Sequence, residues 1–159
     1  MLEIREYQAT DQTDVWNLHN LALEGTGAHL GNGPWDDDLK QIETVYLGNG
    51  GTFLIGRCEG QVVAMGALKK TSPTRAQIRR MRVHPDHQRR GYGQAILNAL
   101  LSRAKQFGYQ VIHLDTTMLQ TAAQRLYEKN GFHETGRKQT DRFTVIFYEK
   151  TLADTGATS

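Results

Sequence analysis

The segment HPDHQRRGYGQAIL, residues 84–97, limits how this chain can fold more than any other, because a basic stretch with two glycines runs directly into an apolar helical pattern. The residues that share one stripe of this pattern are Gly93, Leu97, Leu100, Ala104 and Phe107. The glycines therefore stand at the start of a helix. Backbone N–H groups of a first helical turn have no partner inside the helix and attract anions, and glycine lets a phosphate approach closely. The segment predicts a phosphate site; the alternative is a tightly packed helix start with solvated arginines.

Two common phosphate motifs are excluded by the residues around these glycines. A Walker loop needs Lys followed by Ser or Thr after its last glycine, but Gln94 and Ala95 stand there. A dinucleotide-binding G-x-G-x-x-G motif needs a third glycine where Ile96 stands, and its first glycine must follow a buried strand directly. Here seven residues separate Val83 from Gly91. The predicted phosphate site belongs to neither class.

The composition is that of a single soluble domain. The chain has 159 residues, 38% of them hydrophobic and 23% charged, and a chain of this length can bury one sizeable core. We expect one domain over residues 1–152 and a flexible tail over residues 153–159. The net charge of +2 is too small to indicate a nucleic-acid partner, although arginines gather between Arg75 and Arg90.

Cysteine content and terminal sequence favour a cytoplasmic protein. Cys58 is the only cysteine, so no internal disulfide can form, which fits a reducing compartment. The first residues, MLEIREYQAT, carry no apolar signal core, and no stretch approaches the ~20 apolar residues of a membrane span. We therefore expect no membrane partner.

Hydrophobic periodicity and turn residues predict a mixed α/β chain. The predicted order is a strand over 2–7, a helix up to about 24, a glycine-rich loop over 25–34, a helix over 35–48, an antiparallel hairpin over 52–59 and 61–71, a strand over 76–83, a helix over 91–107, a strand over 111–116, a helix over 121–130, and strands over about 133–140 and 142–151.

The strand AQIRRMRV, residues 76–83, cannot alternate strictly. Ile78 has the opposite parity to Met81 and Val83, so a regular strand cannot bury all three apolar side chains on one face. A bulge near Arg79 to Met81 would bring them together.

At this point the chain resembles a known family on two motifs. Residues 88–93, QRRGYG, resemble the Q/R-x-x-G-x-G/A pattern of the GNAT superfamily of acyltransferases, and AAQRLYEKNGF, residues 122–132, looks like that family's A-x-x-L-Y-x-K-x-G-F helix. The resemblance implies a GNAT fold, a mixed central sheet with a splayed, bulged strand and flanking helices. It also implies transfer of an acyl group, usually acetyl, from acyl-coenzyme A to an amine.

The resemblance assigns a site for acetyl-CoA. The pyrophosphate is expected on backbone amides from Arg89 to Gly93, and the pantetheine arm in the slot beside the bulged strand. The Val83 N–H is expected to face the thioester carbonyl, and an oxyanion donor of this kind is typically worth ~3 kcal/mol. The full set of expected cofactor-binding residues is Met81, Val83, Gln88, Arg89, Arg90, Gly91, Tyr92, Gly93, Gln120 and Ala123.

Tyr127 matches the tyrosine that protonates the departing thiolate in many members of the family. A phenol with a pKa near ~10 stays protonated at neutral pH and can act as this general acid. The alternative is that Tyr127 fills a helix face, with Gly131 and Phe132 forming the helix C-terminal cap. Thr121 and Gln124 have the spacing of a capping box and are expected to start the helix.

Two positions depart from the family pattern. Gln120 stands where many members have a cofactor-binding asparagine, and Gln77 stands where many have a glutamate that acts as general base. Gln77 cannot accept a proton at neutral pH. The base is therefore unassigned, and the candidates are His113, Asp115, His29 or ordered water.

Other readings of the sequence remain open. A catalytically weak acyl-CoA-binding regulator would keep the glycine segment without a base. His84 and His87 lack further ligands, so no metal is expected.

The acceptor pocket is expected between the loop from Gly25 to Trp35 and the strand near Arg79 and Arg80, where arginines facing the pocket would favour a carboxylate-bearing acceptor. The sequence names no acceptor and leaves a homodimer open.

Overall fold

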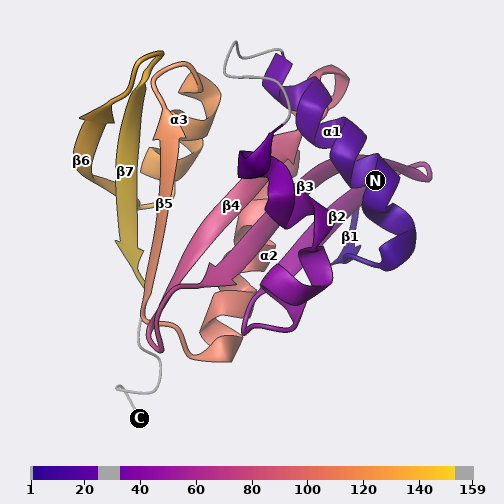
Figure 1. The fold of residues 1–159 in the computed structure, drawn as a ribbon, viewed down its shortest axis with the longest axis horizontal. Helices are drawn as coiled ribbons and strands as arrows, with labels where there is room; N and C mark the ends of the chain where they lie inside the picture. Colours follow the sequence, from indigo (N-terminus) through magenta and orange to yellow (C-terminus); the bar gives the residue numbers. More distant parts are fainter. Residues whose placement is uncertain (1, 25–32, 153–159) are drawn as a thin grey trace.

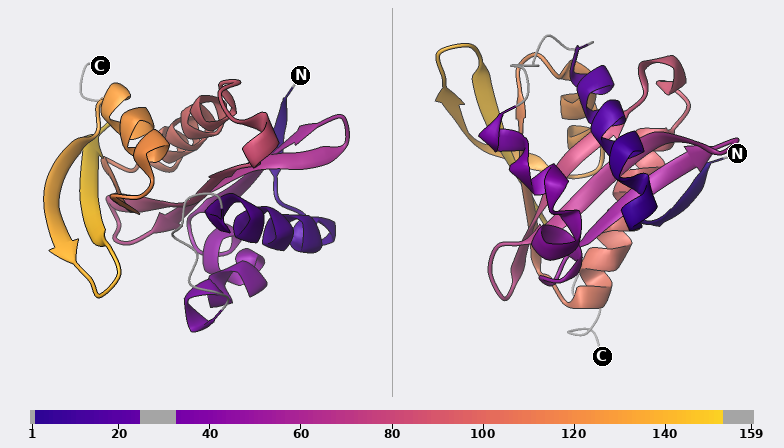
Figure 2. Two further views of the ribbon diagram at one scale, coloured as in Figure 1. Left: turned by 90° about the horizontal axis from the view of Figure 1, so that it is seen from above. Right: turned by 45° about the vertical axis from the view of Figure 1, so that its right-hand side comes forward.

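The computed structural model describes residues 2–24 and 33–152, which form one sheet with helices on both faces (Figures 1 and 2). The helices are α1 (Gln12–Glu24), α2 (Tyr92–Phe107) and α3 (Thr121–Lys129). The strands are β1 (Glu3–Glu6), β2 (Thr52–Cys58), β3 (Gln61–Lys70), β4 (Arg75–Val83), β5 (Val111–Thr117), β6 (His133–Gln139) and β7 (Thr144–Thr151). Their order in the sheet is β1-β2-β3-β4-β5-β7-β6. Among the described residues, no helix is long and apolar enough to cross a membrane.

Two apolar clusters lie on opposite faces of the sheet. The α2 and α3 side buries Leu97, Leu100 and Ala104, as the helical stripe predicts. The cluster on the other side joins apolar residues of α1 and of the segment 39–46 to those of β2 and β3. Phe107 was expected on the buried stripe, but it is 46% exposed. It is the last residue of α2, and its ring lies edge-on against Tyr109 with centroids 6.1 Å apart.

The predicted helix over residues 35–48 is wrong. The chain forms a 3₁₀ helix over Pro34–Lys40, leaves helical geometry at Gln41, and makes a π-type turn over Glu43–Leu47. Contacts with other elements set this path: the Gln12 side chain donates to the Leu39 carbonyl at 2.8 Å, and acidic side chains of the 3₁₀ helix bind α1 and β4. Of the predicted glycine-rich loop, residues 25–32 lie outside the described residues.

The predicted hairpin and bulge are both confirmed. Strands β2 and β3 pair antiparallel around Glu59 and Gly60, which both have positive φ. In β4 the pairing passes from Ala67↔Arg79 to Met65↔Arg82, so β4 holds one residue more than β3 over this interval.

The bulge requires both a left-handed residue and a nearby glycine. Arg80 has φ 58°, a conformation that costs a non-glycine residue roughly 1–2 kcal/mol. Opposite the bulge, a Cβ on Gly66 would lie 2.7 Å from the Met81 sulfur. The bulge places Ile78, Met81 and Val83 against the same apolar cluster beneath α2, which resolves their opposite parity.

The bulge also coincides with the end of pairing between β4 and β5. These parallel strands pair only from Arg75↔Val111 to Gln77↔His113. Beyond that point they diverge, as Figure 1 shows for their upper halves. The expected splay is therefore confirmed.

Candidate active site

The start of α2 leaves backbone N–H groups open. Gly91 is the residue before the helix and has φ 80°, and Arg89 has φ 64°. The first helical bond runs from the Ala95 N–H to the Gly91 carbonyl at 3.0 Å, so the N–H groups before it have no helical partner. A Cβ on Gly91 would meet no protein atom within 4 Å. This open backbone beside two exposed arginines, Arg89 and Arg90, fits a pyrophosphate.

The two glycines of this segment have different surroundings. A Cβ on Gly93 would lie 3.5 Å from Leu126 and 3.7 Å from Val83. Gly93 therefore faces the interior between α3 and β4. Gly93 can contribute its backbone N–H group to a phosphate site. A larger residue at this position would disturb the packing against Leu126 and Val83.

The remaining residues of this segment are placed by contacts with the preceding turn. Gln88 is exposed and extended after the 3₁₀ turn Pro85–His87. The Tyr92 ring stacks on His87 with centroids 6.2 Å apart. Its hydroxyl donates to the Cys58 sulfur at 3.7 Å. Tyr92 can therefore offer its backbone N–H to a phosphate while its ring braces the turn.

A cleft of about 320 Å³ opens where β4 and β5 diverge. It is lined by Arg79, Arg80, Met81, Arg82, Asp115, Thr116, Thr117, Gln120, Ala123, Tyr127, Phe143 and Val145. Four residues assigned from the sequence, Met81, Gln120, Ala123 and Tyr127, thus meet in one place.

The Val83 N–H points towards the same gap. The next residue, His84, donates its N–H to the Val63 carbonyl of β3 at 2.7 Å. Because N–H groups of successive strand residues point to opposite edges, the Val83 N–H faces the edge from which β5 has diverged. An N–H in this position can stabilise an oxyanion in the gap.

Tyr127 combines a packed ring with an accessible hydroxyl. The side chain is 4% exposed, and its ring contacts Phe132 edge-on with centroids 5.6 Å apart. Within the described chain the hydroxyl has no hydrogen-bond partner, and Tyr127 lines the cleft. Burial raises the pKa of this phenol, while the charge of Arg82 lowers it. Tyr127 therefore stays protonated at neutral pH and can donate a proton into the cleft.

The start of α3 differs from the predicted capping box. The residue before the helix is Gln120, and its side-chain oxygen accepts from the Thr117 N–H at 3.2 Å and the Thr116 hydroxyl at 3.1 Å. Gln124 donates to the Thr117 carbonyl at 2.8 Å. Thr121 makes no side-chain cap in the described structure, because the longer glutamine amides already tie the helix to the end of β5.

Asp115 is the described base candidate that lines the cleft. His113 bonds to the Thr71 hydroxyl at 2.9 Å, at the end where β4 and β5 are still paired. Burial and the nearby Arg75 lower the pKa of His113. His29 lies outside the described residues.

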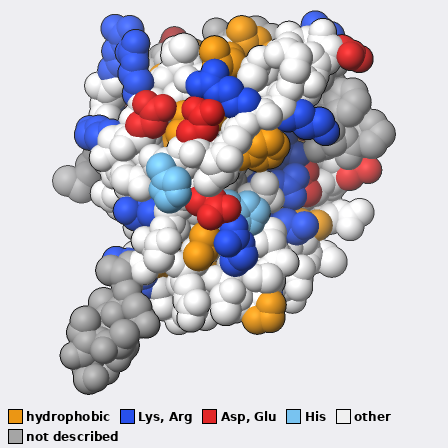
Figure 3. Space-filling view, turned by 90° about the vertical axis from the view of Figure 1, so that its left-hand side faces the viewer, with side chains coloured by type: hydrophobic (Ala, Val, Ile, Leu, Met, Phe, Trp, Pro, Cys, Tyr) orange, Lys and Arg blue, Asp and Glu red, His pale blue; other side chains and the backbone are white. Residues whose placement is uncertain are grey.

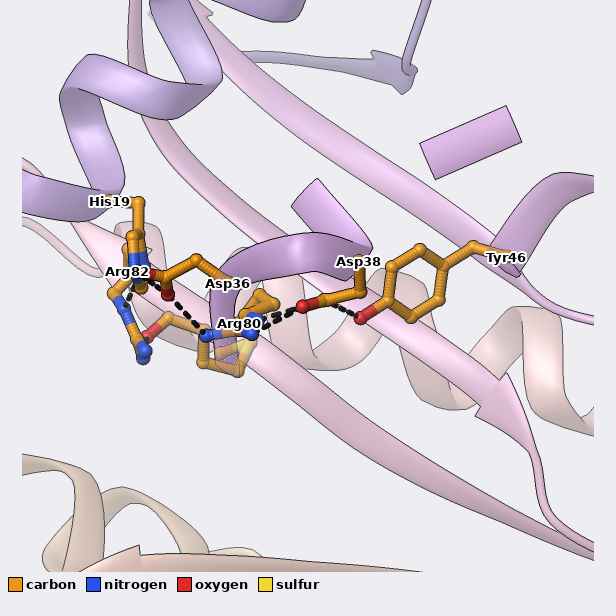
Figure 4. A network of polar contacts seen from close by, with 7 residues as sticks. His19, Asp36, Asp38, Tyr46, Arg80 and Arg82 are labelled. Atoms are coloured by element: carbon orange, nitrogen blue, oxygen red, sulfur yellow. Dashed lines mark hydrogen bonds and ion pairs between the residues drawn. The ribbon is translucent and has the colours of Figure 1, made fainter. Parts of the chain in front are cut away.

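A buried polar network joins the bulge to the 3₁₀ helix (Figure 4). Arg80 donates through Nε to Asp38 Oδ2 at 2.9 Å and pairs with Asp36 at 3.6 Å. Asp38 also accepts from the Tyr46 hydroxyl. Burial tends to raise the pKa of Asp38, but the Arg80 and Tyr46 hydrogen bonds lower it below the ordinary value. Sequence reasoning placed these aspartates in a helical first turn, and no local signal links them to a strand far along the chain.

The second half of the network involves a neutral histidine. His19 Nε2 lies 2.9 Å from Asp36 Oδ1, and Arg82 Nε donates to His19 Nδ1 at 3.4 Å. Burial, together with the charges of Arg82 and Arg80, lowers the pKa of His19 to about 4, although Asp36 acts to raise it. The neutral ring therefore carries its proton on Nε2, which donates to Asp36.

The mixed sheet, the bulge in β4, the splay of β4 from β5 and the glycine-rich start of α2 together define the GNAT fold. Residues 13–132 match the Acetyltransferase (GNAT) family, to which this chain therefore belongs. Human N-acetyltransferase 8 is 33% identical over 122 residues, covering 68% of this chain and 54% of that protein. Human N-acetyltransferase 8B is 33% identical over 106 residues, covering 63% and 47%. The chain thus spans about half the length of these curated relatives.

Solved structures confirm the GNAT fold. An acetyltransferase of the GNAT family from Staphylococcus aureus superposes with a TM-score of 0.87 at 21% identity, covering 95% of this chain and 99% of that one. The Salmonella typhimurium protein yncA, solved with its cofactor acetyl-CoA, superposes with a TM-score of 0.80 at 21% identity, covering 96% and 95%.

Proposed function

We propose that this protein transfers an acetyl group from acetyl-CoA to a primary amine, of a small molecule or an exposed peptide, by direct attack in a ternary complex. The observation that carries the proposal is the placement of the accessible Tyr127 hydroxyl in the cleft where β4 and β5 diverge. Family membership supports it.

The chain offers distinct groups to each part of acetyl-CoA. Backbone N–H groups from Arg89 to Gly93 receive the pyrophosphate, and the exposed arginines Arg89 and Arg90 add positive charge. Met81, Gln120 and Ala123 line the path of the pantetheine arm. The thioester supplies the activated acetyl group.

The chemistry then follows from three groups in the cleft. The amine attacks the thioester carbon, and the Val83 N–H stabilises the negative charge that develops on the carbonyl oxygen. The C–S bond breaks, and Tyr127 gives its proton to the thiolate. Asp115 attracts the ammonium form of the acceptor, whose proton leaves through Asp115 or water. The products are the amide and free CoA.

The direct test measures thiol release from acetyl-CoA against a panel of amines, amino acids and peptides, with the acetylated product identified by mass. We expect release that depends on both the protein and the amine. Calorimetric binding of acetyl-CoA without thiol release from any acceptor would contradict catalysis and favour a regulatory acyl-CoA-binding protein. Absence of binding would contradict both functions.

A further inference from the structure

The two walls of the cleft carry opposite charges. The β4 wall presents Arg79, Arg80 and Arg82, and the β5 wall presents Asp115. The charge available to a ligand depends on which of these groups are already neutralised inside the protein.

Arg80 is neutralised. It forms ion pairs with Asp38 and Asp36, both almost fully buried. Arg80 lines the cleft, as the sequence predicts for this part of the strand, but its guanidinium is engaged by Asp36 and Asp38 in the network that holds the bulge (Figure 4).

Arg82 lacks such a partner. Its hydrogen bonds go to the neutral His19 ring at 3.4 Å and to the Met81 carbonyl at 2.8 Å. In the described part of the chain no carboxylate lies within ion-pair distance of it, and segment 25–32, GTGAHLGN, contains no Asp or Glu. Burial and the charge of Arg80 lower the pKa of Arg82 to about 10. Arg82 is half-buried. A guanidinium that is partly removed from water and has no carboxylate partner is unfavourable, and a bound anion would relieve this cost.

Arg79 adds to this charge. It lines the cleft and forms no ion pair with a described residue, although its charge acts at longer range to lower the pKa of Asp38. Arg79 and Arg82 flank the neutralised Arg80, so the β4 wall retains positive charge on both sides of the bulge.

The position of Arg82 relates this charge to the reaction. Arg82 and Tyr127 line the same cleft. A carboxylate on Arg82 would hold a neighbouring amine close to the proton donor, and Asp115 on the opposite wall would attract the ammonium.

We propose that the acceptor is a zwitterionic amine of the α-amino acid type, with its carboxylate bound by Arg82 and Arg79 and its ammonium facing Asp115. Phe143 and Val145, which complete the lining, favour an apolar side chain on the acceptor. This inference rests on the proposed acetyl transfer and specifies its acceptor.

The test uses matched triples of acceptors that differ at the carboxylate: phenylalanine, phenylalaninamide and 2-phenylethylamine, with the same series for leucine and alanine. We expect kcat/KM for each amino acid to exceed that of its amide and its plain amine roughly 10- to 100-fold, the range expected for hydrogen bonds to a charged group. In Arg82→Gln and Arg79→Gln this preference, measured as the ratio of kcat/KM within each triple, should shrink by a similar factor.

The control is Arg75→Gln. Arg75 lies on the same strand and pairs with Glu149 at 2.7 Å, away from the cleft, so this variant should keep the preference. Equal rates for the amino acids and amides, or a preference retained in both cleft variants, would overturn the inference and leave acetyl transfer standing. If Arg82→Gln does not fold, the parent series and Arg79→Gln still show whether the protein recognises the carboxylate of its acceptor. Failure to acetylate any member of the triples would contradict the acceptor class, and the broader amine panel decides the transfer function separately.

Discussion

At the residue scale, Tyr127 shows that a packing role and a chemical role can coexist in one side chain. The cap formed with Gly131 and Phe132 is confirmed, since the Phe132 N–H donates to the Tyr127 carbonyl at 3.0 Å and the two rings touch. The hydroxyl nevertheless lines the cleft. The ring is held by the core, so the oxygen has a fixed position from which to donate a proton. Its role as general acid stays a prediction.

Tyr127→Phe should lower kcat by ~10²-fold or more and leave acetyl-CoA affinity unchanged, because the proton is needed only as the thiolate leaves. The measurement is kcat under conditions where chemistry limits the rate, with calorimetry for binding. Tyr148→Phe is the matched control: it removes a buried phenol that donates to Glu128 at 2.8 Å and does not line the cleft. A kcat of Tyr127→Phe within about twofold of the parent would remove Tyr127 from the mechanism.

At the element scale, hydrophobic periodicity and turn residues predicted the helices and strands whose conformation is set by their own residues. Alternation predicted the first strand, β-rich runs bounded by turn residues predicted the hairpin, and the parity conflict at Ile78 predicted the bulge. The predicted helix over residues 35–48 is wrong because the shape of this segment depends on tertiary hydrogen bonds and ion pairs. Asp36 and Asp38 bind His19 and Arg80, and these partners cannot be read from helical periodicity. For the same reason the sequence does not show that Arg80 pairs with buried aspartates while Arg82 has no carboxylate partner among the described residues.

The glycine at each end of α2 gives a matched pair of variants. Gly91 and Gly108 have φ 80° and 88°, and a Cβ on either would meet no protein atom within 4 Å. Gly91→Asp and Gly108→Asp should therefore cost similar stability, about 1–2 kcal/mol. Only Gly91→Asp should weaken acetyl-CoA binding, roughly tenfold or more by calorimetry, because its carboxylate would meet the pyrophosphate. Equal affinities in the two variants would place the pyrophosphate elsewhere.

At the scale of the whole molecule, β4 connects the two faces of the domain. Its apolar residues pack beneath α2, while Arg80 and Arg82 reach the opposite face and bind the 3₁₀ helix and α1. The face formed by β6 and β7 shows acidic and basic side chains interspersed (Figure 3). The network of His19, Asp36, Asp38 and Arg80, by contrast, is almost fully buried, so the stability of the fold should depend on the protonation of these groups.

His19 makes that dependence measurable. Its pKa is about 4 in the folded protein against 6.5 for the free side chain. Between pH 6.5 and about 4 the unfolded chain therefore binds a proton that the folded protein does not, so stability falls as the pH is lowered through this window and is fully present above it. The loss attributable to His19 is about 3 kcal/mol.

The test is the variant His19→Gln, whose amide can donate to Asp36 and accept from Arg82 without titrating. We expect its free energy of unfolding, measured by urea denaturation, to depend less on pH than that of the parent. Asp38, whose pKa is lowered, acts with the same sign at more acidic pH in both proteins. An identical slope for parent and variant between pH 4 and 6.5 would show that His19 is not held neutral in the fold.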